Sequence, residues 1–160
     1  MKDYFQEELN IPVYFEPAAF EFNNKKFLVG HGDGLGPGDH GYKLIKKIFR
    51  NKACNWLFGI LPPFIGMGIA HYFSRKSRAQ TGQTNEVFLG EDKEWLIMYC
   101  KEVIKKEPYD YLIFGHRHLP IDFKLNEKSR YINLGDWIKY FSYAVFDGET
   151  MELKYYAAPS

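Results

Sequence analysis

The chain has 160 residues, of which 46% are hydrophobic and 18% aromatic, enough for a hydrophobic core of its own. Its formal net charge of +1 and the lack of a base-stacking motif give no support to nucleic-acid binding. The charged first residues predict no signal peptide. Cys54 and Cys100 lie far apart without a CxxC motif, which is typical of a reducing cytoplasm. We therefore expect a cytoplasmic location.

Two strand-like runs near the N-terminus, residues 18–22 and 26–29, predict a β-hairpin. Asn23 and Asn24 lie between them, and asparagine tolerates the positive φ that a tight hairpin turn requires. A glycine-rich stretch over residues 32–38 then predicts an irregular loop, since so many glycines disfavour regular structure.

The next segment, residues 40 to about 80, predicts a helical insertion with Asp39 placed to cap its first helix. That helix has an apolar stripe at helical spacing. Its members are Leu44, Ile45, Ile48 and Phe49, and the basic residues along the same helix are Lys43, Lys46, Lys47, Arg50 and Lys52.

Residues 56–73 contain no Lys, Arg, Asp or Glu, close to the length of a membrane span. Because Pro62 and Pro63 interrupt this run, we expect two short helices that meet at a bend. Three interpretations remain open: a helical hairpin packed on the protein's own core, an apolar cap that contacts acyl chains or a membrane surface, and a true span. Flanking basic residues favour the membrane-surface interpretation because cations attract anionic headgroups.

Residues 92–106 predict an amphipathic helix that Pro108 stops. The apolar run 109–114 reads as a buried strand. Further strand-like segments follow at residues 121–125, 130–134, 140–146 and 151–156, and we expect them to form a meander-like sheet. The chain is therefore assigned to α/β layers with a helical insertion.

Three of the five histidines follow predicted strands, in Gly30-His31-Gly32-Asp33 and in Gly115-His116-Arg117-His118. A glycine after a buried strand lets the chain turn and present side chains at the mouth of the sheet. A lone histidine there is more often a partly buried ring with one satisfied hydrogen bond. Three in this setting predict a metal site, because imidazole is the commonest metal-binding side chain. His40 and His71 are interpreted as surface or cap residues.

The two histidine motifs resemble the last two motifs of the calcineurin-like metallophosphoesterases. Together with the insertion and the segment Asn133-Leu134-Gly135-Asp136-Trp137, they more closely resemble the UDP-2,3-diacylglucosamine diphosphatases of lipid A synthesis. The resemblance covers essentially the whole chain. It implies that residues 1–160 form the C-terminal part of a calcineurin-like layered αββα metallophosphoesterase fold, with a helical cap insertion at about 40–80. The family's Asp-x-His, Gly-Asp and Gly-Asn-His-Asp blocks do not occur here, so we expect a longer parent enzyme.

The resemblance implies metal-dependent hydrolysis of the diphosphate of UDP-2,3-diacylglucosamine to UMP and a lipid monophosphate by that parent. The resemblance implies two divalent ions, Mn²⁺ in this family. His31 and His116 would bind one ion and His118 the other, and His116 is the expected catalytic residue. Asp33 would orient His31. Substrate contacts are expected from Arg75, Lys76, Arg78, Thr81 and Asn85, and Arg117 faces either solvent or a phosphate.

Because the missing blocks would supply the bridging carboxylate, we expect this chain alone to lack hydrolase activity. Two other interpretations remain open: a catalytically silent metal-binding or protein-interaction module, and a peripheral module on the inner membrane built on residues 56–73. We also expect a homo-oligomer, because an unpaired strand edge and apolar surface would otherwise contact water. The surface expected to be covered holds Trp137, Tyr140, Phe141 and Tyr143.

Overall fold

The computed structural model describes residues 3–37, 40–81 and 87–156, except for the side chains of residues 40–42, 44 and 76–81. The chain divides into two compact units. The first unit contains Met1–Asp33 and Cys100–Ser160, and the second unit contains Gly34–Tyr99. Strands occur in the first unit and most of the helices in the second, so the α/β class expected from the sequence is confirmed at this level.

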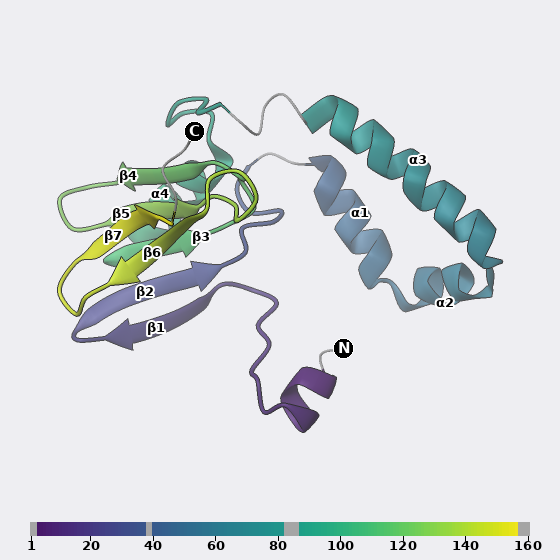
Figure 1. Ribbon diagram of the computed structural model, residues 1–160, viewed down its shortest axis with the longest axis horizontal. Coiled ribbons are helices and arrows are strands. Elements are labelled where there is room, and N and C mark those ends of the chain that lie inside the picture. The colour runs from purple at the N-terminus through teal and green to yellow at the C-terminus, as the bar shows by residue number, and fades with distance from the viewer. Residues whose placement is uncertain (1–2, 38–39, 82–86, 157–160) are drawn as a thin grey trace. The chain divides into compact units, whose positions relative to one another are not determined.

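The first unit is built on β-strands (Figure 1). After a short π-helical turn, η1 (Tyr4–Glu8), its strands are β1 (Ala18–Phe22), β2 (Lys25–Gly30), β3 (Tyr111–Phe114), β4 (Pro120–Lys124), β5 (Arg130–Leu134), β6 (Ser142–Phe146) and β7 (Met151–Tyr155). The helix α4 (Trp95–Lys106) begins in the second unit and continues in the first from Cys100.

The predicted N-terminal hairpin is present as β1 and β2, paired antiparallel with Phe22 opposite Lys25. Asn23 and Asn24 both adopt positive φ, 49° and 60°. This is the backbone that a two-residue hairpin loop needs to match the twist of its strands. The Asn-Asn pair therefore fixes the register that brings β2 to its end at Gly30.

Strands β1 to β5 form one sheet in the order β1-β2-β3-β5-β4, in which β2 and β3, and β3 and β5, run parallel. The expected C-terminal meander is wrong. The β4–β5 hairpin joins the main sheet, whereas β6 and β7 form a separate two-stranded antiparallel sheet. All four residues of β3 are buried, and such a strand needs a neighbour at each edge. The central run of β5 is buried too, and β5 takes that place.

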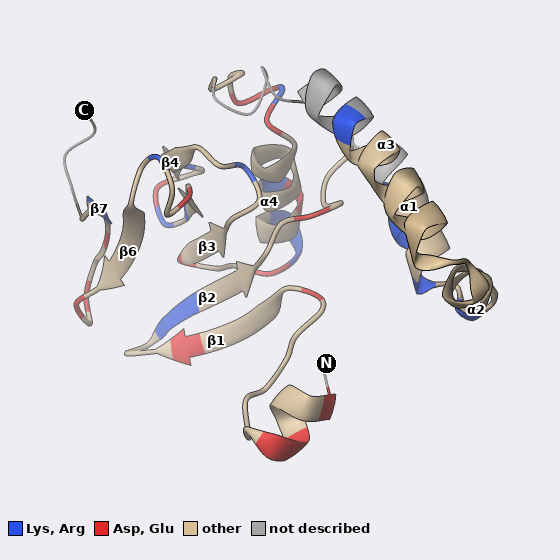
Figure 2. Ribbon diagram, turned by 45° about the vertical axis from the view of Figure 1, so that its right-hand side comes forward, with Lys and Arg blue, Asp and Glu red and all other residues tan. Residues whose placement is uncertain are grey.

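The first unit is layered, with its hydrophobic core on the face of the main sheet that the β6–β7 hairpin covers. The core residues are Phe27, Tyr111, Ile113, Ile132 and Met151, with Ala144, Phe146 and Leu153 of the hairpin packed against them. The part of α4 that starts at the fully buried Cys100 lies on the opposite side of the sheet (Figure 2). With the β6–β7 hairpin on one face of the main sheet and this part of α4 on the other, the ends of the strands are the part of the sheet that stays open.

The second unit contains α1 (His40–Arg50), α2 (Lys52–Ile60) and α3 (Pro63–Thr81). Lys52, expected on the first helix, instead starts α2, because the Asn51 side chain ends the first helix and accepts hydrogen bonds from the backbone N–H of Ala53 and Cys54. The expected bend is confirmed: Leu61 is extended before Pro62. Within the described ranges, no helix is both long and apolar enough to cross a membrane.

Of two predicted helix starts, the cap of one is not tested and the position of the other differs from the prediction. Asp39, the expected cap of α1, lies outside the described residues. The helix expected from residue 92 begins at Trp95, because the backbone N–H groups of Lys93 and Glu94 both donate to the carbonyl of Gly90 in a preceding turn. The helix otherwise ends at Lys106, two residues before Pro108, as predicted.

Candidate metal centre

The ends of three parallel strands meet at one edge of the main sheet. Gly30 at the end of β2 is in register with Phe114 at the end of β3, and Phe114 is in register with Asn133 near the end of β5. In parallel sheets, side chains that follow such strand ends gather at the same mouth. His31 and the Gly115–His118 loop leave the sheet at this edge.

The structure brings two of the three predicted histidines together. The rings of His31 and His116 lie edge to face, with centroids 5.3 Å apart and planes at 76°. Their backbones are joined as well, since the N–H of Gly115 donates to the carbonyl of His31 at 3.1 Å. His31 is exposed and His116 half-buried, so the pair faces the mouth of the sheet with access to solvent.

The backbone of His116 is held in a costly conformation. Its φ is 65°, in the left-handed region, where a non-glycine residue other than Asn or Asp costs on the order of 1–2 kcal/mol. The N–H of Arg117 donates to the Gly115 carbonyl at 2.7 Å and closes the turn around His116. Strain of this kind persists where the surrounding structure imposes it, and it is concentrated at functional sites.

A fully buried side chain on β5, Asn133, fixes that turn from the neighbouring strand. Its Nδ2 donates to the Gly115 carbonyl at 2.5 Å and to the Tyr131 hydroxyl at 3.0 Å. Its Oδ1 accepts the N–H of Gly135 at 3.1 Å. The amide thus ties the loop that carries His116 to the loop that follows β5. Sequence reasoning gave Asn133 no role, although it ends an apolar strand as the histidine motifs do.

His118 lies near Asp136, a second residue that sequence reasoning gave no role. The Nδ1 of His118 is 3.8 Å from Oδ2 of Asp136. Oδ1 of Asp136 accepts the N–H groups of Ile138 and Lys139 at 2.9 and 2.6 Å. Burial opposes the charge of this carboxyl, but the backbone donors and His118 outweigh it and hold the pKa of Asp136 below its ordinary value. A charged carboxylate held in this way can orient an imidazole ring.

The rings of His31 and His116 fit the part of a divalent metal site that histidine side chains supply. Two neutral imidazoles at the mouth of a sheet suit first-row divalent ions. Among the described residues, no three His, Cys, Asp or Glu side chains are grouped closely enough to hold an ion. A metal ion held here would take two imidazole donors from His31 and His116 and its other ligands from beyond this pair.

The remaining predicted residues are scattered. Asp33 lies half-buried in the loop after His31, and Arg117 is half-buried between the two later histidines. Arg75 is exposed on α3 in the second unit. The side chains of Lys76, Arg78 and Thr81, also on α3, and the whole of Asn85 lie outside the described residues.

Comparisons with known proteins point to one enzyme name. No family model matches the chain. A UDP-2,3-diacylglucosamine hydrolase of Porphyromonas gingivalis is 34% identical, over 96% of this chain and 63% of that protein. A UDP-2,3-diacylglucosamine hydrolase of Aeromonas salmonicida is 26% identical, over 98% of this chain and 61% of that protein. A UDP-2,3-diacylglucosamine hydrolase of Pseudomonas putida is 27% identical, over 76% of this chain and 50% of that protein.

The resemblance expected from the sequence motifs is therefore confirmed. The chain is related to the UDP-2,3-diacylglucosamine hydrolases over nearly all of its own length. It spans less than two thirds of the length of these relatives.

Replacing Asn133 with Leu should destabilise the first unit, because it removes the side-chain hydrogen bonds that Asn133 makes to the Gly115 carbonyl, the Tyr131 hydroxyl and the Gly135 N–H. We expect the free energy of unfolding to fall by about 2–4 kcal/mol in urea titrations. Asn55→Leu, at an exposed position on α2, is the matched control and should change it by less than about 0.5 kcal/mol. Equal stability of Asn133→Leu and wild type would show that these hydrogen bonds do not hold the site.

Proposed function

We propose that this relative of the UDP-2,3-diacylglucosamine hydrolases carries the histidine ligands of a metal-dependent phosphoanhydride hydrolase. Its substrate is UDP-2,3-diacylglucosamine, a nucleotide-linked glycolipid of lipid A synthesis, and its products are UMP and a lipid monophosphate. The proposal takes the first unit as part of a calcineurin-like layered metallophosphoesterase fold and the helices α1 to α3 as its cap. The names of the relatives and the histidine geometry support it.

The observation that carries the proposal is the His31–His116 pair, drawn together by parallel strand ends and edge to face at 5.3 Å. These two residues are far apart in sequence, and the turn at His116 has a costly backbone. Two imidazole rings that lie together at a solvent-accessible edge of the sheet can each offer a ring nitrogen to the same metal ion.

In this proposal each histidine has a defined task. His31 and His116 hold one ion, His118 holds the other, and Asp33 and Asp136 orient His31 and His118 through their far ring nitrogens. Two divalent ions, Mn²⁺ by the donor set and the resemblance, would activate a water molecule and neutralise the phosphoryl oxygens. Hydrolysis would add the oxygen of water to one phosphorus as the bridging P–O bond breaks. One proton of the water would stay with that phosphate, and the other would go to the leaving phosphate oxygen or to solvent.

Substrate binding is assigned to the later part of the cap. The cations Arg75, Lys76 and Arg78 would meet the diphosphate, since charge-assisted hydrogen bonds to phosphate are strong. Thr81 and Asn85 would contact the glucosamine. Arg75 is exposed and open to such a contact. The hydrolase would act in the cytoplasm, peripherally on the inner membrane where a diacyl substrate resides.

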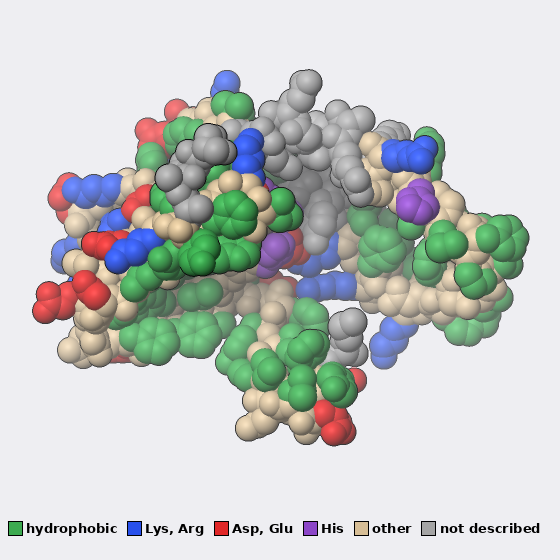
Figure 3. Space-filling view, viewed as in Figure 1, with side chains coloured by type: hydrophobic (Ala, Val, Ile, Leu, Met, Phe, Trp, Pro, Cys, Tyr) green, Lys and Arg blue, Asp and Glu red, His purple; other side chains and the backbone are tan. Residues whose placement is uncertain are grey.

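One observation favours a second candidate function, binding to a membrane surface. Trp56, Leu57, Phe64 and Met67 on α2 and α3 are each at least 60% exposed. Figure 3 shows hydrophobic side chains gathered over α2 and the adjoining end of α3. Exposed apolar side chains gathered in one place are typical of an interaction site.

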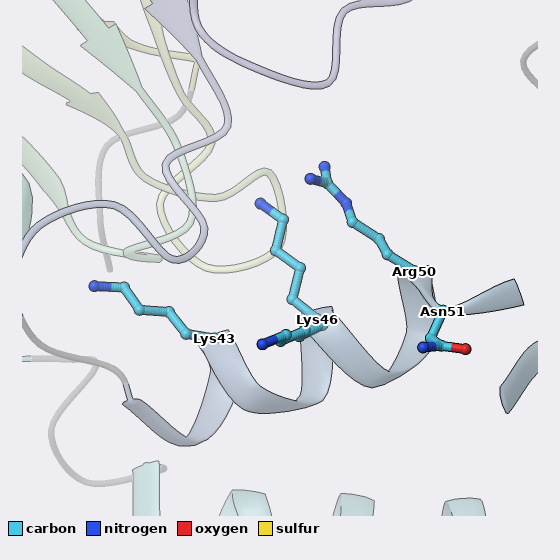
Figure 4. Close-up of a pocket in the computed structure, with 5 residues that line it drawn as sticks. Lys43, Lys46, Arg50 and Asn51 are labelled. Carbon is cyan, nitrogen blue, oxygen red and sulfur yellow. The ribbon is translucent and has the colours of Figure 1, made fainter. Parts of the chain in front are cut away.

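The first helix of the second unit, α1, carries several cationic side chains. Lys43, Lys46, Lys47 and Arg50 line an open hollow with Asn51 (Figure 4), at the spacing of one helix face. Among the described residues of α1, none is acidic. Cations beside an apolar surface attract anionic headgroups. In the first unit, β1 pairs only with β2 among the described strands, so its other edge is unpaired. We expect the isolated chain to self-associate through such an open strand edge.

The metal assignment predicts that the chain binds Mn²⁺ through His116. Titration of Mn²⁺ followed by the loss of its free-ion electron paramagnetic resonance signal should give a Kd that rises at least about tenfold in His116→Ala. His71→Ala, at an exposed histidine on α3, is the matched control and should bind as wild type. Binding that is unchanged in His116→Ala, or lost equally in His71→Ala, would remove His116 from the site.

The chain alone should not hydrolyse UDP-2,3-diacylglucosamine in Mn²⁺, because three histidines lack the bridging carboxylate that the mechanism needs. UMP release is the measurement. A longer protein that adds Asp-x-His and Asn-His-Asp blocks upstream should turn over, and His116→Ala should abolish its activity while His71→Ala retains it. A longer protein that stays inactive would favour a silent metal-binding or protein-interaction module.

The membrane assignment predicts that the chain sediments with liposomes that contain anionic lipid. Trp56→Ser should lower the bound fraction at least about threefold, since an interfacial tryptophan is lost. Lys46→Gln with Lys47→Gln should abolish the preference for anionic over zwitterionic vesicles. Trp95→Ser, on α4, is the matched control. Equal binding by all four proteins would contradict the assignment.

A further inference from the structure

A cluster of four aromatic rings lies in the first unit, away from its hydrophobic core. Trp137 is its centre, and its ring centroid is 6.0 Å from that of Phe141, 6.1 Å from that of Tyr143 and 6.0 Å from that of Tyr156. We call these four residues the aromatic cluster. Its members come from the loop after β5, the start of β6 and the end of β7.

The aromatic cluster lies at the same edge of the unit as the histidines. Asp136, directly before Trp137, holds its carboxylate 3.8 Å from the His118 ring. The hydroxyl of Ser142 donates to the Leu134 carbonyl at 2.6 Å, so β6 begins where β5 ends. The N–H of Tyr156 donates to the Phe141 carbonyl at 2.9 Å and brings the end of β7 to the same place. The cluster therefore continues the proposed hydrolytic site.

The backbone around the cluster is specified closely. Apart from three asparagines, the non-glycine residues with positive φ in the described ranges are His116 and Phe141. Both lie at this edge, and such conformations are concentrated at functional sites. Gly135 also has positive φ, 73°, and a Cβ there would lie 2.5 Å from the Ser142 hydroxyl. The loop that carries Trp137 thus depends on glycine.

The cluster remains open to solvent although its rings contact one another. Trp137 is 56% exposed and Tyr156 is 78% exposed. Three ring neighbours limit the rotamers of Trp137, so a partner that stacks on it would cost little side-chain entropy. Flat aromatic partners gain most from such a platform.

We infer that the aromatic cluster binds the nucleobase of a nucleotide whose phosphates reach the histidine site. This inference rests on the proposed function, which places a uridine nucleotide at that site. Stacking on an aromatic side chain is worth about 1–3 kcal/mol per base and needs no sequence-specific contact. Trp137 is the stacking residue, and Tyr143 and Tyr156 hold its ring and extend the platform.

The probe is uridine, which has the base and lacks phosphate, with its Kd measured by saturation-transfer NMR on the chain. Trp137→Ala should raise that Kd about tenfold, as expected for the loss of one stacking partner. Trp137→Phe keeps a ring and should retain most of the affinity. Trp95→Ala, at another exposed tryptophan, on α4, is the matched control and should bind as wild type. Tyr156→Ala is a second variant in case Trp137→Ala does not fold.

His116→Ala separates this inference from the proposed function. It should leave uridine affinity unchanged while it weakens Mn²⁺ binding. If uridine does not bind, or binds equally to Trp137→Ala and wild type, the inference is wrong even where Mn²⁺ binding depends on His116. If Trp137→Ala instead splits a dimer in light scattering and uridine does not compete with that dimer, a second copy covers the cluster and the inference is again wrong.

Discussion

The site depends on the parallel pairing of β2, β3 and β5 with their ends in register. This pairing places His31 and His116 side by side although 84 residues separate them, and a buried amide on the third strand secures the arrangement. Asn133 is fully buried and its amide is hydrogen-bonded on both sides, so its desolvation is offset. Any shift of β5 along β3 would break those bonds, because they join one strand to the loop of its neighbour. The register of these strands therefore also determines how the two histidines lie relative to each other.

That constraint explains how the chain tolerates a left-handed backbone at His116. A glycine there would remove the strain and with it the ring that meets His31. The hydrogen bonds of the Gly115 amide and carbonyl, to His31 and Asn133, anchor the residue just before the turn. The unfavourable conformation of His116 is therefore imposed by the hydrogen bonds that hold Gly115 directly before it, together with the one from the Arg117 N–H to the Gly115 carbonyl.

Local features of this fold could be predicted from the sequence, and non-local pairing could not. The β1–β2 turn follows from two adjacent asparagines, and the α2–α3 bend follows from two adjacent prolines, since each acts on its own backbone. The insertion of β5 between β3 and β4 depends on burial over the whole sheet, which alternation within a single segment does not encode. The histidine positions were predicted from strand ends. The roles of Asn133 and Asp136 were missed because their partners are backbone groups or lie in other loops.

The second unit presents the opposite physical situation. All nine residues of α2 are described and none is buried, and large apolar side chains on α3 are exposed as well. Short helices in water gain little from backbone hydrogen bonds alone and take most of their stability from packing an apolar face. The Asn51 cap and the contact between α1 and α2 supply part of that stability. Trp56, Phe64 and Met67 remain exposed, and in the proposed membrane binding a surface of acyl chains would cover them without demanding a fixed shape. In the proposed functions, a lipid-bearing substrate and a lipid surface would both contact the exposed apolar side chains of these helices.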